Sequence, residues 1–272
     1  MVCGPTASGK SELSDALAEA HGTHVPTLVI DSMQVYREIP VITNQARRRP
    51  AELAGIVSVA EEWTVARHRE RAEEIIRGID TPFVLDCGTG MYLNAIILDV
   101  PLAPKVEEQT RRVAQEITAG APNPRRAARA KELELAGAPD RGSIWDGELL
   151  YDTIMIYLRP NTAKLDTAIS KRSEMIVRDG LEEAAEIKEM TGVNASVMDS
   201  IGVRELVEHL EGKMSMEEAQ DRSSARTRKL ARRQMRWFDK LARSLEGRTD
   251  IHVAESPADI DFSNCMHDRM RA

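Results

Sequence analysis

The sequence predicts an α/β fold: a doubly wound parallel sheet built around a phosphate-binding loop (P-loop), with a small helical insertion and a helical C-terminal part. Three observations support this prediction. A glycine-rich motif at residues 4–11 lies between a short apolar run and a helical stretch. Short apolar, β-branched runs then alternate with helical stretches, which is typical of a parallel sheet with helices on both faces. From residue 161 onward the pattern is mostly helical.

The motif at residues 4–11 reads Gly-Pro-Thr-Ala-Ser-Gly-Lys-Ser, which matches the phosphate-binding pattern G-x-x-x-x-G-K-[ST]. Backbone N–H groups of such a loop point at an anion from the start of a helix, where the helix dipole adds to the attraction. Lys10 offers a mobile positive charge to phosphate oxygens, and Ser11 offers a hydroxyl to Mg²⁺. The predicted phosphate-binding residues are Gly4, Thr6, Ala7, Ser8, Gly9, Lys10 and Ser11.

The other elements follow in order along the chain. Strands are expected over residues 1–3, 27–32, 82–86, 153–158 and 251–254. Helices are expected over residues 11–20, 61–78, from 91 onward, and over 105–137 with an interruption at 120–124. Ligands of parallel sheets bind at the carboxyl ends of the strands, so Asp31 and Asp86 should lie beside the P-loop. Asp31 could act as an acid–base group or, with Ser32, as a helix cap, and Asp86 could be a Mg²⁺-associated acid or a cap.

Length and composition limit the domain organisation. With 272 residues, 42% of them hydrophobic, the chain can form one large domain that carries an insertion. We expect the first part of the P-loop core over residues 1–102, a short helical insertion over 103–150, and the completed core with basic helices over 151–272. No stretch reaches the ~20 apolar residues of a membrane span, and no export signal is recognised at the N-terminus.

Cysteine usage and net charge limit the class of protein further. The three cysteines are widely spaced and indicate neither a metal site nor a disulfide framework: Cys3, Cys87 and Cys265. A reducing, cytoplasmic location is therefore expected. The net charge of −7 argues against a protein that coats nucleic acid indiscriminately, but it leaves room for a local basic surface.

A long basic helix is predicted near the C-terminus. Ser215 and Glu218 form a capping box, and the helix should run to about Arg243. Basic residues recur on it at spacings of three and four, and so form one stripe: Arg222, Arg226, Lys229, Arg233, Arg236 and Lys240. A charged stripe is commonly a solvated helix face. Like charges four residues apart repel each other, however, which favours an anionic partner such as nucleic acid or a diphosphate.

Four segments, in this order, resemble the tRNA dimethylallyltransferases (tRNA isopentenyltransferases). They are the P-loop and residues 31–37 (DSMQVYR), 88–93 (GTGMYL) and 227–238 (TRKLARRQMRWF). Two weaker matches are residues 175–181 and 202–205. The resemblance covers most of the chain except roughly residues 103–158, where the helical insertion is shorter than in the family.

The resemblance implies a prenyl transfer from dimethylallyl diphosphate to N6 of an adenosine beside the tRNA anticodon. It implies that the P-loop binds the diphosphate with Mg²⁺ at Ser11, and that Asp31 is the base that removes a proton from the amine. Thr6 and Thr89 would lie between the two substrates, and Arg172 would contact the diphosphate. Gln34 would lie near the target nucleotide. The basic stripe would contact tRNA phosphates, through Arg222, Arg226, Lys229, Arg233 and Arg236.

Three other functions remain open on the sequence. A relative that prenylates a free adenine nucleotide would need no clamp on the anticodon arm, which suits the short insertion. A small-molecule kinase would use ATP at the same loop. A non-catalytic RNA-binding protein would not require Lys10, Ser11 and Asp31, which are all present. The preferred prediction is a monomeric, Mg²⁺-dependent tRNA prenyltransferase.

Overall fold

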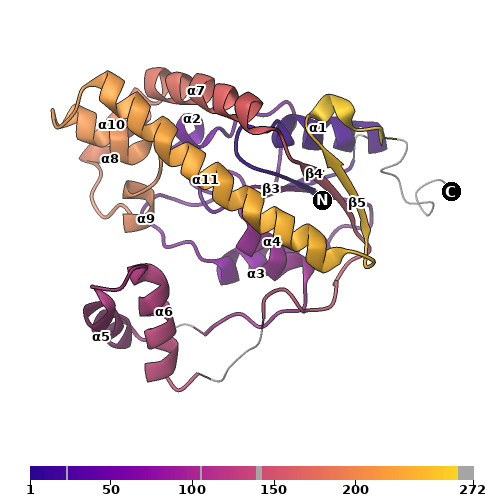
Figure 1. Cartoon of the computed structure of the whole chain (residues 1–272), viewed down its shortest axis with the longest axis horizontal. Coiled ribbons are helices and arrows are strands. Elements are labelled where there is room, and N and C mark those ends of the chain that lie inside the picture. Colours follow the sequence, from indigo (N-terminus) through magenta and orange to yellow (C-terminus); the bar gives the residue numbers. More distant parts are fainter. Residues whose placement is uncertain (23, 105, 139–142, 263–272) are drawn as a thin grey trace.

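The protein has a parallel sheet with helices on both faces (Figure 1). The computed structural model describes residues 1–22, 24–104, 106–138 and 143–262. Within them the strand order is β2-β3-β1-β4-β5, and every pairing is parallel. The strands are β1 (Val2–Cys3), β2 (Thr27–Ile30), β3 (Val84–Cys87), β4 (Ile154–Leu158) and β5 (Asp250–Ala254). The predicted fold class and all five predicted strands are confirmed.

Apart from the short α2, which was not predicted, the helices lie in the expected stretches with small shifts of their ends. The first eight are α1 (Lys10–His21), α2 (Pro40–Thr43), α3 (Val65–Arg77), α4 (Gly90–Ile97), α5 (Glu108–Thr118), α6 (Pro124–Leu135), α7 (Thr162–Asp179) and α8 (Leu181–Glu189). The last three are α9 (Ala195–Met198), α10 (Val203–Leu210) and α11 (Met216–Leu245), and a 3₁₀ turn follows at Pro257–Asp259. Helix α3 begins four residues later than predicted, because the side chain of Thr64 caps it by accepting a hydrogen bond from the backbone N–H of Arg67.

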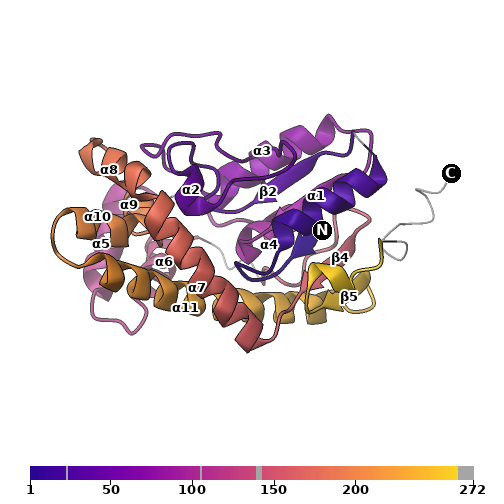
Figure 2. The same ribbon diagram turned by 90° about the horizontal axis from the view of Figure 1, so that it is seen from above.

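Alternate residues of the strands face two separate cores. On one face, Cys87 and Tyr157 pack with apolar residues of α3, α4 and α11, including Phe238. On the other, Val2 and Ile156 pack with α1. Strands β1 to β4 are almost wholly buried, and strands buried on both faces need continuous apolar sequence, which explains why these four were recognisable as short apolar runs. Figure 2 shows α7 and α11 side by side, and the two helices contact each other. Phe238 and Leu241 of α11 pack in the same core as Tyr157 of the sheet.

Two of the three cysteines are buried free thiols in the described part of the chain. Cys3 and Cys87 lie opposite each other on β1 and β3, and both are free. Burial raises the pKa of Cys3 to about 12 and raises that of Cys87 well above its usual value. Neither is therefore a reactive thiolate at neutral pH. Cys265 lies outside the described residues.

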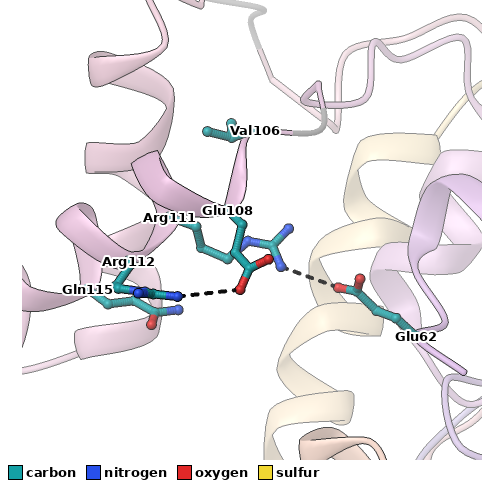
Figure 3. Close-up of a pocket in the computed structure, with 6 residues that line it drawn as sticks. All are labelled: Glu62, Val106, Glu108, Arg111, Arg112 and Gln115. Atoms are coloured by element: carbon teal, nitrogen blue, oxygen red, sulfur yellow. Dashed lines mark ion pairs between the residues drawn. The ribbon is translucent and has the colours of Figure 1, made fainter. Parts of the chain in front are cut away.

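Helices α5 and α6 pack on each other, apart from the sheet (Figure 1). They lie within residues 103–150, and the domain boundaries given above remain a prediction. After the insertion, Leu149 forms an isolated antiparallel bridge with Leu98 of the core. A cavity of about 290 Å³ lies between α5 and the core (Figure 3). Arg111 there approaches Glu62 to 3.6 Å, and an ion pair this exposed contributes little to stability.

None of the helices in the described part of the chain is both long enough and apolar enough to cross a membrane.

A buried histidine gives the fold a specific pH dependence. His68 is fully buried on α3, and its Nδ1 accepts a hydrogen bond from Trp63 Nε1 at 3.0 Å. Burial lowers the pKa of His68 to about 4, whereas the unfolded chain has a value near 6.5. Between these values the unfolded state binds more protons, so the free energy of unfolding falls as the pH is lowered from 6.5 to 4. We expect a loss of about 3 kcal/mol over this window from His68.

Denaturant unfolding at pH 7, 6 and 5 measures this effect. The variant His68→Phe should lose the corresponding part of the pH slope, while a matched change at the exposed His24 should keep it. Equal slopes in the wild type and His68→Phe would show that His68 is not the responsible group.

Candidate active site

The P-loop has the backbone shape of an anion-binding concavity. Ala7 and Gly9 have positive φ angles of 63° and 87°, and α1 begins directly after them without a side-chain cap. Its first-turn N–H groups therefore remain available to an anion. Gly4 is required for close packing, because a Cβ there would lie 2.5 Å from the carbonyl oxygen of Leu158. Ser8 Oγ is buried and has no hydrogen-bond partner among the described residues, as expected for a donor that a ligand would satisfy.

Two half-buried cations, Lys10 of the P-loop and Arg172 near it, lack full compensation for their loss of solvent. Lys10 Nζ donates a hydrogen bond to the carbonyl of Pro5 at 2.9 Å. Burial lowers the pKa of Lys10, the charge of Asp86 opposes this shift, and the positive charge of Arg172 adds to it. Burial also lowers the pKa of Arg172, and the carboxylate of Asp31 opposes that shift. A bound anion would favour the charged form of both residues, so the site formed by the P-loop, Lys10 and Arg172 is suited to a diphosphate.

Asp31 has the capping role considered for it, and its second oxygen remains available for the acid–base role. Its Oδ1 accepts hydrogen bonds from the backbone N–H groups of Met33 at 2.8 Å and Gln34 at 3.3 Å, which makes it a local cap. Its Oδ2 lies 3.5 Å from Thr89 Oγ1. Thr89 Oγ1 in turn accepts from the N–H of Ser32 at 3.1 Å. One oxygen thus fixes the carboxylate, and the other faces Thr89, which the resemblance places between the two substrates.

The loop after β3 passes very close to this carboxylate. A Cβ on Gly88 would lie 2.4 Å from Asp31 Oδ2, so a larger residue there would displace this carboxylate. The structure thereby brings Asp31, Thr89 and the backbone of Gln34 together, at the carboxyl ends of β2 and β3.

Arg47 was missed in the sequence, and it changes the interpretation of Asp86. Arg47 contacts Asp86 at 2.6 Å and Asp15 at 2.8 Å, and at most 5% of each of the three side chains is exposed. It also donates to the carbonyl of Ser11 at 3.4 Å. Asp86 is therefore the partner of a buried arginine rather than a helix cap. The three consecutive arginines at positions 47–49 and an acid inside an apolar strand were the available signals.

A second missed residue joins the basic helix to this site. Gln234 lies on α11, and its Oε1 accepts a hydrogen bond from the N–H of Thr6 at 2.9 Å. Its Nε2 donates to the carbonyl of Gly88 at 2.8 Å. The side-chain amide therefore connects α11 to the P-loop and to the loop that carries Thr89.

The IPP transferase family model matches residues 34–241, which is more than half of the chain. The chain belongs to the IPP transferase family. A relative from Rubrobacter xylanophilus named tRNA dimethylallyltransferase is 58% identical and covers 98% of this chain and 94% of its own length. Another protein of that name, from Rickettsia bellii, is 29% identical over 97% of this chain and 91% of its own length.

Solved structures of IPP transferases share the fold. The full-length tRNA isopentenylpyrophosphate transferase of Bacillus halodurans has a TM-score of 0.69 at 25% identity, covering 97% of this chain and 91% of its own. The tRNA delta(2)-isopentenylpyrophosphate transferase of Staphylococcus epidermidis has a TM-score of 0.67 at 22% identity, covering 96% and 94%. The resemblance inferred from the ordered motifs is thus confirmed.

In this IPP transferase the basic stripe on α11 divides into two parts. Arg222 and Arg226 are engaged within the protein, by Glu208 at 2.6 Å and by Glu205 at 2.5 Å. The remaining cations of the predicted RNA-binding set are exposed and have no ion pair within the described residues: Lys229, Arg233 and Arg236. At the C-terminal end of the stripe, Lys240 Nζ lies 4.3 Å from the centre of the Trp145 ring. The free part of the stripe is therefore the middle of α11.

The donor set near the P-loop fits Mg²⁺ bound together with a substrate. The described residues contain no cluster of three or more His, Cys, Asp or Glu side chains that could hold a metal alone. Mg²⁺ typically takes few protein ligands and relies on substrate phosphates and water. Ser11, half-buried in the first turn of α1, supplies a hydroxyl oxygen beside the unsatisfied Ser8 Oγ and the anion-binding loop.

Proposed function

We propose that this enzyme transfers a dimethylallyl group from dimethylallyl diphosphate to N6 of an adenosine next to the tRNA anticodon. The observation that supports this most strongly is the placement of Asp31. The carboxylate at the end of β2 lies close enough to the half-buried cations Lys10 and Arg172 for its charge to oppose the lowering of their pKa by burial. A proton acceptor therefore lies beside a site for an anionic leaving group. The name of the Rubrobacter xylanophilus relative agrees with this function.

Each group has one task in the reaction. The loop N–H groups, Lys10 and Arg172 bind the diphosphate and stabilise its charge as the bond between the prenyl carbon and oxygen breaks. The N6 lone pair forms the new C–N bond, and the proton lost from N6 moves to Asp31 Oδ2, which is the oxygen not fixed by the local cap. Thr89 positions that oxygen. Mg²⁺, held at Ser11, would neutralise part of the charge of the leaving diphosphate.

One observation favours a second acceptor, a free adenine nucleotide. The described insertion consists of only α5 and α6, and a mononucleotide would need no larger clamp. The exposed, unpaired cations Lys229, Arg233 and Arg236 favour tRNA instead, because a mononucleotide would not need a stripe of that length. The free buried thiols of Cys3 and Cys87 suit a cytoplasmic enzyme.

A transfer assay separates the two acceptors. Radiolabelled dimethylallyl diphosphate and Mg²⁺ are supplied with unmodified tRNA in one reaction and with AMP in another. We expect label in tRNA and none in AMP. Label in AMP alone would show that the protein is a nucleotide prenyltransferase and not a tRNA enzyme. Label in neither would favour a kinase or a non-catalytic protein, and an ATP-turnover assay would then separate these two.

The free part of the stripe predicts a specific effect on RNA binding. Arg233→Glu should weaken tRNA binding and flatten its dependence on salt, because phosphate contacts release counterions. The slope of log K against log[salt] should fall in magnitude by about 1 per lost contact. Binding titrations at several salt concentrations measure this slope. Arg222→Glu is the comparison variant: because Arg222 is already paired with Glu208, this substitution should change the salt slope less than Arg233→Glu does. An unchanged slope in Arg233→Glu would show that the stripe is only a solvated face.

A further inference from the structure

Gln234 is a polar residue on the packed side of the basic helix. At about 100° per residue, it points away from the exposed side that carries Lys229 and Arg236. Its neighbours on the packed side are apolar: Ala231 and Phe238 are fully buried. A polar amide placed among apolar residues must find hydrogen-bond partners, and its two partners are both in the active site.

Both ends of the amide are used, and each bond fits only one orientation. Oε1 accepts from the N–H of Thr6 at 2.9 Å, and Nε2 donates to the carbonyl of Gly88 at 2.8 Å. A backbone N–H can only donate and a carbonyl can only accept, so the two bonds fix the orientation of the amide. Thr6 belongs to the P-loop, and Gly88 directly precedes Thr89. One side chain on α11 thus holds the donor-binding loop and the loop beside Asp31 at a fixed separation.

We propose that Gln234 is a positioning residue that couples tRNA docking on the exposed side of α11 to diphosphate binding in the P-loop. The inference rests on the proposed function, because it takes tRNA as the ligand of the exposed stripe. Arg233, which would contact tRNA, is next to Gln234 in the chain. When tRNA docks and shifts this turn of α11, Gln234 moves with it. Its two hydrogen bonds transmit the movement to the P-loop and to the loop that contains Gly88. Binding of one ligand then arranges the site for the other, and the coupling is reciprocal.

The coupling is measured as a ratio of affinities. Pyrophosphate with Mg²⁺ is titrated calorimetrically into the wild type, with and without saturating unmodified tRNA. We expect tRNA to tighten pyrophosphate binding about 10-fold in the wild type. In Gln234→Met, which keeps the length of the side chain but removes both hydrogen bonds, this factor should fall to about one. Gln220→Met, the same change at a half-buried position on the same helix, should keep the wild-type factor.

A structural role alone would give a different result. If Gln234→Met weakens both ligands equally and keeps the wild-type factor, or if the wild type shows no coupling, the proposal is wrong. Thermal unfolding checks that the variant is folded. If Gln234→Met does not fold, Gln234→Glu is used in its place. Glutamate can still accept the hydrogen bond from the N–H of Thr6 but cannot donate one to the carbonyl of Gly88. The Gln234→Glu variant should therefore also lose the coupling. Label transfer to tRNA by the wild type is measured in parallel, so a failure of the proposed function is seen separately from a failure of the coupling.

Discussion

Asp31→Ala should bind diphosphate like the wild type and yet lose prenyl transfer. The carboxylate acts on the proton of the acceptor amine, whereas the P-loop, Lys10 and Arg172 act on the donor. General-base catalysis contributes roughly 10²–10⁴-fold, and we expect kcat to fall by that order. Single-turnover transfer measures the rate, and calorimetry with pyrophosphate measures donor binding.

Asp31→Asn separates catalysis from local structure. An asparagine oxygen can still accept the backbone N–H of Met33, as Asp31 Oδ1 does at 2.8 Å, but the amide is not a base. We expect the same loss of transfer with a smaller loss of stability than in Asp31→Ala. Wild-type transfer by either variant would remove Asp31 as the proton acceptor.

Arg47→Met should be the most destabilising single change near the site. It would leave the buried carboxylates of Asp15 and Asp86, only 3% and 4% exposed, without the cation that compensates them. Breaking a buried pair by removing one partner costs about 3–5 kcal/mol. Urea unfolding should show this as a lower midpoint at constant m-value.

The adjacent arginine supplies the matched control. Arg48 lies 3.8 Å from Glu19, and both side chains are about half exposed. Arg48→Met should change stability by less than ~1 kcal/mol. Equal effects of the two substitutions would show that the ion pairs of Arg47 with Asp15 and Asp86 do not stabilise the protein.

Features that depend on neighbouring residues could be predicted from the sequence. The P-loop, the strand that ends before Asp31 and the capping box of Ser215 with Glu218 all depend on local backbone geometry, and the structure contains each of them. Strand positions were recognisable because strands buried on both faces of a parallel sheet require short apolar runs.

Contacts between distant residues could not be predicted in this way. Gln234 lies 228 positions from Thr6, and Arg47 lies 39 positions from Asp86. Helical periodicity also placed Arg226 on the stripe but could not show that Glu205, on a different helix, would pair with it. Each of these contacts depends on how elements pack, and no local pattern specifies packing.

The most direct test of the account is the position of the label in the product. Two unmodified tRNAs would be offered with labelled dimethylallyl diphosphate and Mg²⁺; they would differ only in the nucleotide next to the anticodon, adenosine in one and guanosine in the other. The account predicts labelled N6-prenyl adenosine after nuclease digestion of the first tRNA, and no label in the second. Equal labelling of both tRNAs, or label in neither, would contradict the claim that this site prenylates that adenosine.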